Sequence, residues 1–137
     1  MEMKVTFPGG KKVDAHFNGF SYQTDQSVAG GGEGAAPPPF DLFLASLATC
    51  AGIYVKGFCD TRSIDTTSLE LRLRIVPDPD RGRIGTLGID ILLPEGFPAK
   101  WKRAVVRAAD LCAVKQHMIE PPNFEVQAFL PGERVEV

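Results

Sequence analysis

Two cysteines, Cys50 and Cys112, are the residues of this chain best suited to chemistry. Apolar side chains recur every three or four residues around each of them, so both thiols fall on the apolar sides of predicted helices. We therefore expect the two thiols to point inward, toward each other. Two thiols in one apolar cleft can form and break a disulfide, so this placement indicates redox chemistry.

Each thiol also has a purely structural interpretation. Free cysteine is among the most buried residue types and often serves as a small hydrophobic side chain. An apolar environment also raises the pKa of a thiol and so suppresses the nucleophilic thiolate. A reactive thiol here therefore requires a nearby cation or hydrogen-bond donor. The third cysteine, Cys59, is expected on the opposite side of its helix from Cys50 and outside the pair.

Two helices are expected to position the cysteines. The first, residues 37–59, begins with three prolines, which the opening turn of a helix tolerates, and continues as an apolar run. The second, residues 98–112, is amphipathic and ends at its cysteine. The basic side chains on its solvated side are Lys100, Lys102, Arg103 and Arg107.

The first helix is apolar on more than one side, and a small domain has little other surface with which to bury all of it. One predicted stripe contains Phe43, Leu47, Cys50, Tyr54 and Phe58. A second apolar face must be covered by the chain's own sheet or by another copy of the chain, and we expect a symmetric homodimer. The residues of this second face are Leu44, Ala48, Ala51 and Val55.

Several segments show the alternation that is typical of strands. In residues 68–77 leucine and isoleucine alternate with charged side chains, which predicts a half-buried strand. Residues 25–36 contain several glycines without periodicity and are expected to form a mobile loop. Antiparallel strands segregated from two helices predict an α+β fold in one domain, residues 1–137. The other predicted strands are residues 3–7, 12–24, 87–93 and 124–130, with a turn at 78–83.

Composition excludes several classes of function. A net charge of −2 and a pI near 5.7 argue against a nucleic-acid partner. We find no apolar targeting segment at the start and expect no apolar run of the roughly 18 residues that a membrane helix requires, so we expect a cytoplasmic protein without a membrane partner. Three cysteines are too few for a secreted disulfide scaffold. Cys112 and His117 lack further spaced ligands, so no metal or other cofactor is expected.

The order of these features resembles the family of osmotically inducible protein C (OsmC) and organic hydroperoxide resistance (Ohr) proteins. The resemblance rests on a proline-led helix with Ala-Thr-Cys at Cys50, a following hairpin, and a second helix that ends in Cys112. It covers about residues 30–130. It implies an OsmC-like intertwined homodimer and a thiol-dependent peroxidase that acts in the oxidative stress response.

The resemblance also implies roles for particular residues. Cys50 would reduce an organic hydroperoxide to an alcohol and become a sulfenic acid, and Cys112 would close a disulfide with it. An external dithiol would then reduce this disulfide. An apolar pocket would favour organic hydroperoxides over hydrogen peroxide. The side chains expected to line this pocket are Phe43, Leu47, Tyr54 and Trp101.

The chain departs from the peroxidase branches of this family in the groups that activate the thiolate. There an arginine from the N-terminal sheet pairs with the thiolate, whereas the first arginine here is Arg62. The carboxylate that supports that arginine aligns with Phe40, so Asp41 and Glu33 are the nearest candidates. Asp41 can equally be a charge that stabilises a helix N-terminus. The alternatives to a peroxidase are a small-ligand-binding or redox-sensing protein without turnover, and a purely structural dimer.

Overall fold

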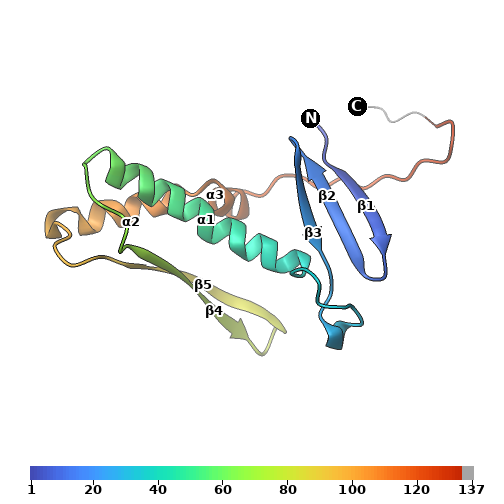
Figure 1. Cartoon of the computed structure of the whole chain (residues 1–137), viewed down its shortest axis with the longest axis horizontal. Helices are drawn as coiled ribbons and strands as arrows, with labels where there is room; N and C mark the ends of the chain where they lie inside the picture. Colours follow the sequence, from blue (N-terminus) through green and yellow to red (C-terminus); the bar gives the residue numbers. More distant parts are fainter. Residues whose placement is uncertain (134–137) are drawn as a thin grey trace.

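The computed structural model describes residues 1–133 and contains two antiparallel sheets and three α-helices (Figure 1). This architecture confirms the predicted α+β class. In chain order the elements are β1 (Lys4–Gly9), β2 (Lys12–Phe17), β3 (Phe20–Thr24), the 3-10 helix η1 (Val28–Gly30), α1 (Pro39–Asp60), β4 (Glu70–Asp78), β5 (Arg83–Leu92), the 3-10 helix η2 (Ala99–Trp101), α2 (Lys102–Asp110) and α3 (Ala113–Ile119).

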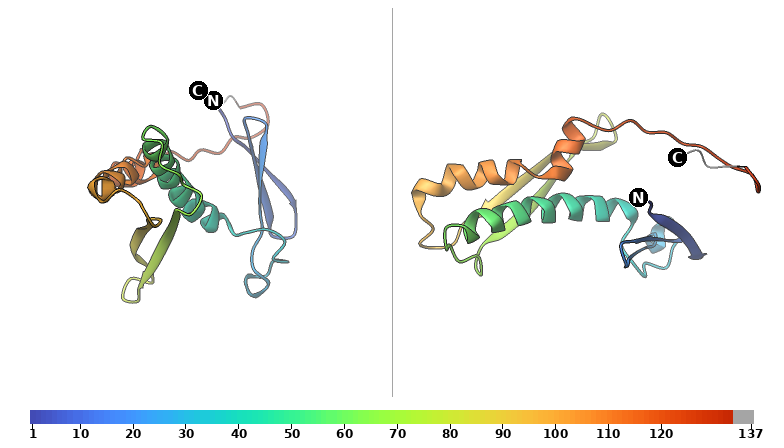
Figure 2. Two further views of the ribbon diagram at one scale, coloured as in Figure 1. Left: turned by 60° about the vertical axis from the view of Figure 1, so that its left-hand side comes forward. Right: turned by 90° about the horizontal axis from the view of Figure 1, so that it is seen from above.

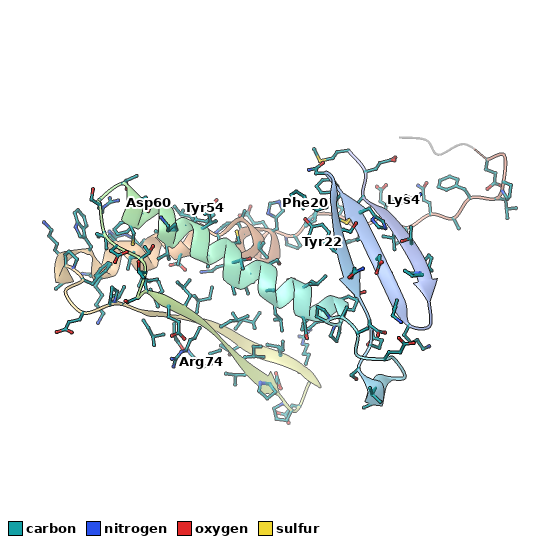
Figure 3. The ribbon with its side chains drawn as sticks, in the orientation of Figure 1. Lys4, Phe20, Tyr22, Tyr54, Asp60 and Arg74 are labelled. Atoms are coloured by element: carbon teal, nitrogen blue, oxygen red, sulfur yellow. The ribbon has the colours of Figure 1, made fainter. Side chains whose placement is uncertain are left out.

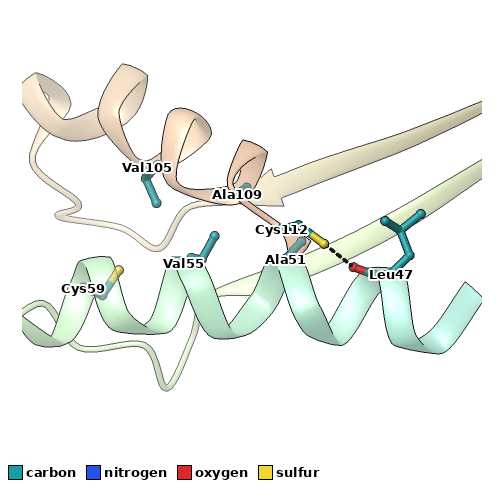
Figure 4. Close-up of a cluster of buried hydrophobic side chains, with 7 residues drawn as sticks. All are labelled: Leu47, Ala51, Val55, Cys59, Val105, Ala109 and Cys112. Atoms are coloured by element: carbon teal, nitrogen blue, oxygen red, sulfur yellow. Dashed lines mark hydrogen bonds between the residues drawn. The ribbon is translucent and has the colours of Figure 1, made fainter. Parts of the chain in front are cut away.

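Helix α1 is the centre of the structure. It lies over the β4–β5 ribbon and has α2 alongside it (Figures 1 and 2). Its buried residues recur every fourth position, which places them on one side of the helix. Together with three residues of the α2 segment they form the hydrophobic core (Figure 4). The core residues are Leu47, Ala51, Val55, Cys59, Val105, Ala109 and Cys112.

The buried side of α1 differs from the predicted stripe. Cys50 is half-buried and Tyr54 is exposed. Ala51 and Val55, predicted on the face to be covered by the chain's own sheet or by another copy, are buried by the chain itself. Cys59 is also fully buried, although it takes no part in the cysteine pair. The residues on both sides of this helix are apolar, so periodicity alone does not determine which side faces the sheet.

The β4–β5 ribbon forms as predicted. Leu71 lies opposite Ile91 and Leu73 opposite Ile89, and these side chains pack against the core. On the other face Arg74 forms an ion pair with Asp90, at 3.1 Å between nitrogen and oxygen. Strict alternation of apolar and charged side chains therefore predicts both the strands and their orientation.

The N-terminal sheet has one more strand than predicted, because residues 12–24 form a hairpin and not a single strand. Asn18 and Gly19 form the turn, with φ angles of 49° and 81°. Positive φ at both central residues matches a two-residue type I′ turn, for which Asn-Gly is a preferred sequence. This three-stranded sheet lies beyond the N-terminal end of α1, away from the β4–β5 ribbon (Figures 1 and 2).

The glycine-rich segment after β3 is held in a defined path, in contrast to the mobile loop expected. The carboxylate of Asp25, which is only 1% exposed, accepts hydrogen bonds from the backbone N–H groups of Gln26, Glu33 and Ala35 at 2.7, 3.1 and 3.1 Å. These bonds, led by that of Ala35, lower the pKa of Asp25. The path also needs glycine at Gly32, where a Cβ atom would lie 2.1 Å from the Gln26 carbonyl oxygen.

The C-terminal third differs from the prediction in two ways. The second helix ends at Asp110 and, after a break at Leu111 and Cys112, a further helix follows. Residues 124–130, predicted as a strand, have no strand partner within the described chain. Phe124 and Val126 are 86% and 97% exposed. A strand is stable only beside a neighbouring strand, and no sheet edge among residues 1–133 pairs with the segment.

Helix α1 also differs from the expectation about membrane segments. Its 22 residues have a mean hydropathy of 1.6 over an 18-residue window, so by length and composition alone the helix is long and apolar enough to span a membrane. A central helix of a soluble fold passes the same test, and α1 packs against α2 and the ribbon in this way. We therefore interpret it as the core helix.

The cysteine pair as a candidate active site

The structure brings Cys50 and Cys112 together, as the helical spacing predicts. Cys50 lies near the middle of α1, and Cys112 lies in the break between α2 and α3. The chain passes back along α1, so the end of α2 lies over the middle of the first helix (Figure 4). Both thiols are free, and they lie close enough for each to shift the pKa of the other.

The two thiols differ in their access to solvent. Cys112 is fully buried, whereas Cys50 is half-buried. The S–H group of Cys112 also donates to the backbone carbonyl of Leu47, at 3.7 Å between sulfur and oxygen (Figure 4). A reactant from solvent therefore reaches Cys50 first, and the buried thiol lies behind it.

The surroundings of the two thiols also shift their pKa values in opposite directions. The backbone N–H of Val114 lowers the pKa of Cys50, and the Cys112 thiol and the N–H of Ala113 lower it further. Burial raises the pKa of Cys112, and its hydrogen bond to Cys50 raises it further. Hydrogen bonds to a thiolate favour ionisation, and loss of water opposes it. Cys50 is therefore the thiol that ionises first.

The donors that stabilise a Cys50 thiolate belong to the first turn of α3. The N–H groups in the first turn of a helix have no partner within the helix, so Ala113 and Val114 are free to donate to the sulfur. The sequence points to an arginine or lysine for this role and gives no direct sign of these N–H groups. A backbone donor has no side-chain signature, and the only signal was a possible helix break beside Cys112.

The two predicted carboxylates lie away from the thiols within the described chain. Asp41 is exposed in the first turn of α1, nine residues before Cys50. That spacing is about 14 Å along a helix axis. Glu33 belongs to the glycine-rich segment and forms an ion pair with Lys12 of β2.

An apolar cavity of about 370 Å³ lies among α1, β5, α2 and α3, and neither cysteine of the pair is among the residues that line it. Its wall includes the side chain of Leu47, the residue whose carbonyl accepts the Cys112 hydrogen bond. The ion pair between Lys115 and Asp110 lies at the same cavity. The other apolar side chains that line it come from β5, α2 and α3: Leu87, Ile89, Val106, Ala109, Met118 and Ile119.

The four side chains predicted to line a pocket do not share one cavity in the described chain. Leu47 lines the cavity above, and Tyr54 lines a separate, more open hollow between α1 and the end of α2. Phe43 packs against Phe40, with 5.3 Å between ring centroids. Trp101 packs edge-on against Phe58 at 6.0 Å.

Comparison with known proteins gives the family. The model of the OsmC-like protein family matches residues 30–127. The structure is similar to a Psychrobacter arcticus protein described as osmotic stress induced and as a detoxification response protein, with a TM-score of 0.69 and 26% identity over 83% of this chain and 85% of that chain. No curated protein matches.

Two organic hydroperoxide resistance proteins share the fold. The OsmC protein of Legionella pneumophila is 20% identical over 86% of this chain and 89% of that chain, with a TM-score of 0.50. OhrB of Bacillus subtilis is 19% identical over 86% of this chain and 90% of that chain, also with a TM-score of 0.50. The family match spans well over half of the residues, and the chain therefore belongs to the OsmC-like protein family.

Proposed function

We propose that this protein is a thiol-dependent peroxidase that reduces organic hydroperoxides to alcohols. The observation that carries the proposal is the asymmetry of the cysteine pair. Cys50 is accessible and has a lowered pKa, and it lies beside a buried thiol whose pKa is raised. A thiolate is the nucleophile in thiol chemistry, and a second thiol in contact can resolve its oxidised form.

The reaction uses the two thiols in turn. The Cys50 thiolate attacks the terminal oxygen of the hydroperoxide, the O–O bond breaks, and the alkoxide takes up a proton and leaves as an alcohol. Cys50 is then a sulfenic acid. The Cys112 thiol attacks its sulfur and expels water, which leaves a Cys50–Cys112 disulfide. An external dithiol restores both thiols and is oxidised to its own disulfide.

The apolar cavity supports an organic substrate over hydrogen peroxide. Its wall is made mostly of aliphatic side chains, including Leu47 from the turn of α1 before Cys50. An alkyl group gains free energy by leaving water for such a surface, and hydrogen peroxide has no alkyl group. Phe43, Tyr54 and Trp101 do not line this cavity in one copy of the chain. In the proposed homodimer, these side chains of the second copy would complete the substrate pocket.

Exposed apolar surface supports a homodimer. In the N-terminal sheet Phe20 and Tyr22 lie on one face of β3 and are exposed (Figure 3). Ile53 of α1 and the extended segment with Phe124 and Val126 are exposed as well. Apolar patches of this kind mark protein–protein contacts. The three free cysteines agree with a reducing compartment, and we place the protein in the cytoplasm.

The test of this proposal is peroxide consumption by matched cysteine variants. With dithiothreitol as reductant, we expect the wild type to consume cumene hydroperoxide faster than hydrogen peroxide. Cys50→Ser should abolish the activity, and Cys112→Ser should leave a sulfenic acid that dimedone traps. Cys59→Ser is the control and should retain the rate, because Cys59 lies nine residues after Cys50, about 14 Å along α1. Full activity in Cys50→Ser would rule the proposal out.

One observation favours a second candidate, a small-ligand-binding protein without turnover. The cavity among α1, β5, α2 and α3 is apolar and does not depend on thiol chemistry. In that case an alkyl ligand should raise the melting temperature of wild type and Cys50→Ser equally, and neither protein should consume hydroperoxide.

A further inference from the structure

The outward face of α2 carries a concentration of positive charge. We call Lys100, Lys102, Arg103 and Arg107 the α2 basic face; all four are exposed. None of them forms an ion pair with another residue of the described chain. The chain as a whole has a net charge of −2, so this face contrasts with the rest of the molecule.

Two of the four charges are favourably placed in the fold: Arg107 lies in the last turn of α2, where the helix dipole favours positive charge, and the ammonium of Lys100 in η2 lies 5.3 Å from the centre of the Trp101 ring. The other two are not. Lys102 and Arg103 lie at the N-terminal end of α2, where the helix dipole favours negative charge, and the first turn has no acidic residue. Arg103 and Arg107 are four residues apart, a spacing at which like charges repel on a helix surface. The unfavourable placement of Lys102 and Arg103 points to an interaction with something outside the chain.

The α2 basic face is continuous with apolar surface that leads to the cysteine pair. Val106, 49% exposed, lies among Lys102, Arg103 and Arg107 in a surface hollow. Arg107 and Leu111 are again four residues apart and so share a side of the segment. Leu111 is 61% exposed and immediately precedes Cys112. Arg107 itself lies five residues before Cys112, about 8 Å at helical rise.

We propose that the α2 basic face, with Val106 and Leu111, docks the external reductant, a dithiol protein whose surface is acidic around its two thiols. This inference rests on the proposed function, which requires such a reductant. Apolar side chains surrounded by charged ones are the usual composition of a protein–protein contact. Complementary charge accelerates encounter and orients the partner. A face only eight residues long on an acidic chain fits a small acidic protein better than nucleic acid.

The docked reaction is a thiol–disulfide exchange. One thiolate of the reductant attacks the sulfur of Cys50, which is the accessible one, and the Cys50–Cys112 bond breaks. Cys112 leaves as a thiolate and is protonated. The second thiol of the reductant then attacks the mixed disulfide, releases the Cys50 thiol and closes the reductant's own disulfide. Two electrons and two protons pass to this protein.

The experiment compares two synthetic dithiol peptides as probes. Both contain Cys-Gly-Pro-Cys, one flanked by glutamates and the other by serines. The protein is first oxidised with diamide, so no hydroperoxide chemistry is needed, and the return of free thiols is followed by alkylation and mass measurement. We expect the glutamate peptide to reduce the wild type about tenfold faster than the serine peptide at low salt, and this advantage to vanish at high salt.

The variants locate the effect. Arg103→Glu with Arg107→Glu should abolish the advantage of the glutamate peptide, whereas dithiothreitol should reduce wild type and variant at equal rates. The matched control, Lys11→Glu with Arg83→Glu, makes the same charge change at exposed positions on the two sheets and should keep the advantage. Equal rates for the two peptides on the wild type, or an equal loss in the control, would overturn the docking proposal.

A binding measurement separates this proposal from the peroxidase itself. A fluorescent glutamate peptide with serines in place of its cysteines should bind the reduced wild type and not the Arg103→Glu, Arg107→Glu protein. If that holds while Cys50 does not react with hydroperoxide, the peroxidase fails and the docking face stands. If the arginine pair instead determines binding to phosphatidylserine vesicles and has no effect on the peptide, the face is a lipid contact and the docking proposal is wrong.

Discussion

The main-chain donors at the start of α3 give the sharpest test of how Cys50 is activated. Ala113 is exposed and is the first residue of α3, a position that accepts proline. Cys112 before it has φ −47° and ψ 118°, an extended conformation compatible with a following proline. Ala113→Pro therefore removes one N–H donor from Cys50 and is expected to leave the helix in place.

A well-formed hydrogen bond to a charged group contributes about 1.5–3 kcal/mol. The N–H of Ala113 lowers the pKa of Cys50 less than the N–H of Val114 does, so its removal should cost less than that range. Because about 1.4 kcal/mol corresponds to a tenfold change in the thiolate population, the rate of Cys50 with iodoacetamide at neutral pH should fall, but by less than about tenfold.

The pH dependence distinguishes this cause from a general loss of structure. The pKa of Cys50 is lowered in the folded protein, so the thiolate is present above it and is lost as the pH falls through it. In Ala113→Pro the rate profile should move to higher pH, and the two proteins should react equally fast in strong base. Ala113→Gly keeps the N–H and is the control. An unchanged profile in Ala113→Pro would refute activation by these donors.

Three further predictions concern stability. Cys59→Ser places a hydroxyl in a fully buried apolar site and should lower the free energy of unfolding by about 1–3 kcal/mol in urea denaturation, with the reactivity of Cys50 unchanged. Asp25→Asn should lower stability at neutral pH. Hydrogen bonds lower the pKa of Asp25 in the folded protein, so its carboxylate stabilises the fold fully at pH values above its ordinary pKa of 3.8 and less as the pH falls further. The difference in unfolding free energy between wild type and Asp25→Asn should therefore become smaller in acid. A difference that stays constant with pH would contradict this. Gly32→Ala should lower the melting temperature more than Gly30→Ala, because a Cβ would lie 2.1 Å from a backbone oxygen at Gly32 and 3.3 Å from a serine hydroxyl at Gly30.

The sequence predicts those parts of the fold in which one local signal is unambiguous. The β4–β5 ribbon follows from strict alternation, and the length of α1 follows from its proline start and apolar run. The hairpin turn at Asn18 and Gly19 was predictable from the Asn-Gly dipeptide but was overlooked. The fate of residues 124–130 was not predictable, because strand formation depends on a partner and not on the segment alone.

The candidate site divides in the same way. The contact between Cys50 and Cys112 was predictable only in part, because Cys50 lies beside the buried row of α1 and not in it. The role of the N–H groups of Ala113 and Val114 was not predictable from the sequence. Every residue except proline has an N–H group, and only the local backbone conformation determines where it points. The expected arginine was sought among side chains, and the structure supplies peptide groups in its place.

The hydrogen bonds of Asp25 have a practical consequence for engineering this protein. Glycine-rich surface loops are common choices for inserting tags or joining new termini. An insertion in residues 26–35 would pull apart the three N–H groups that converge on Asp25 and leave its carboxylate buried without donors. The exposed turn at residues 79–82 joins the two strands of the ribbon and lies outside the core. The turn at residues 79–82 is therefore the better insertion site, although the segment 26–35 contains more glycine.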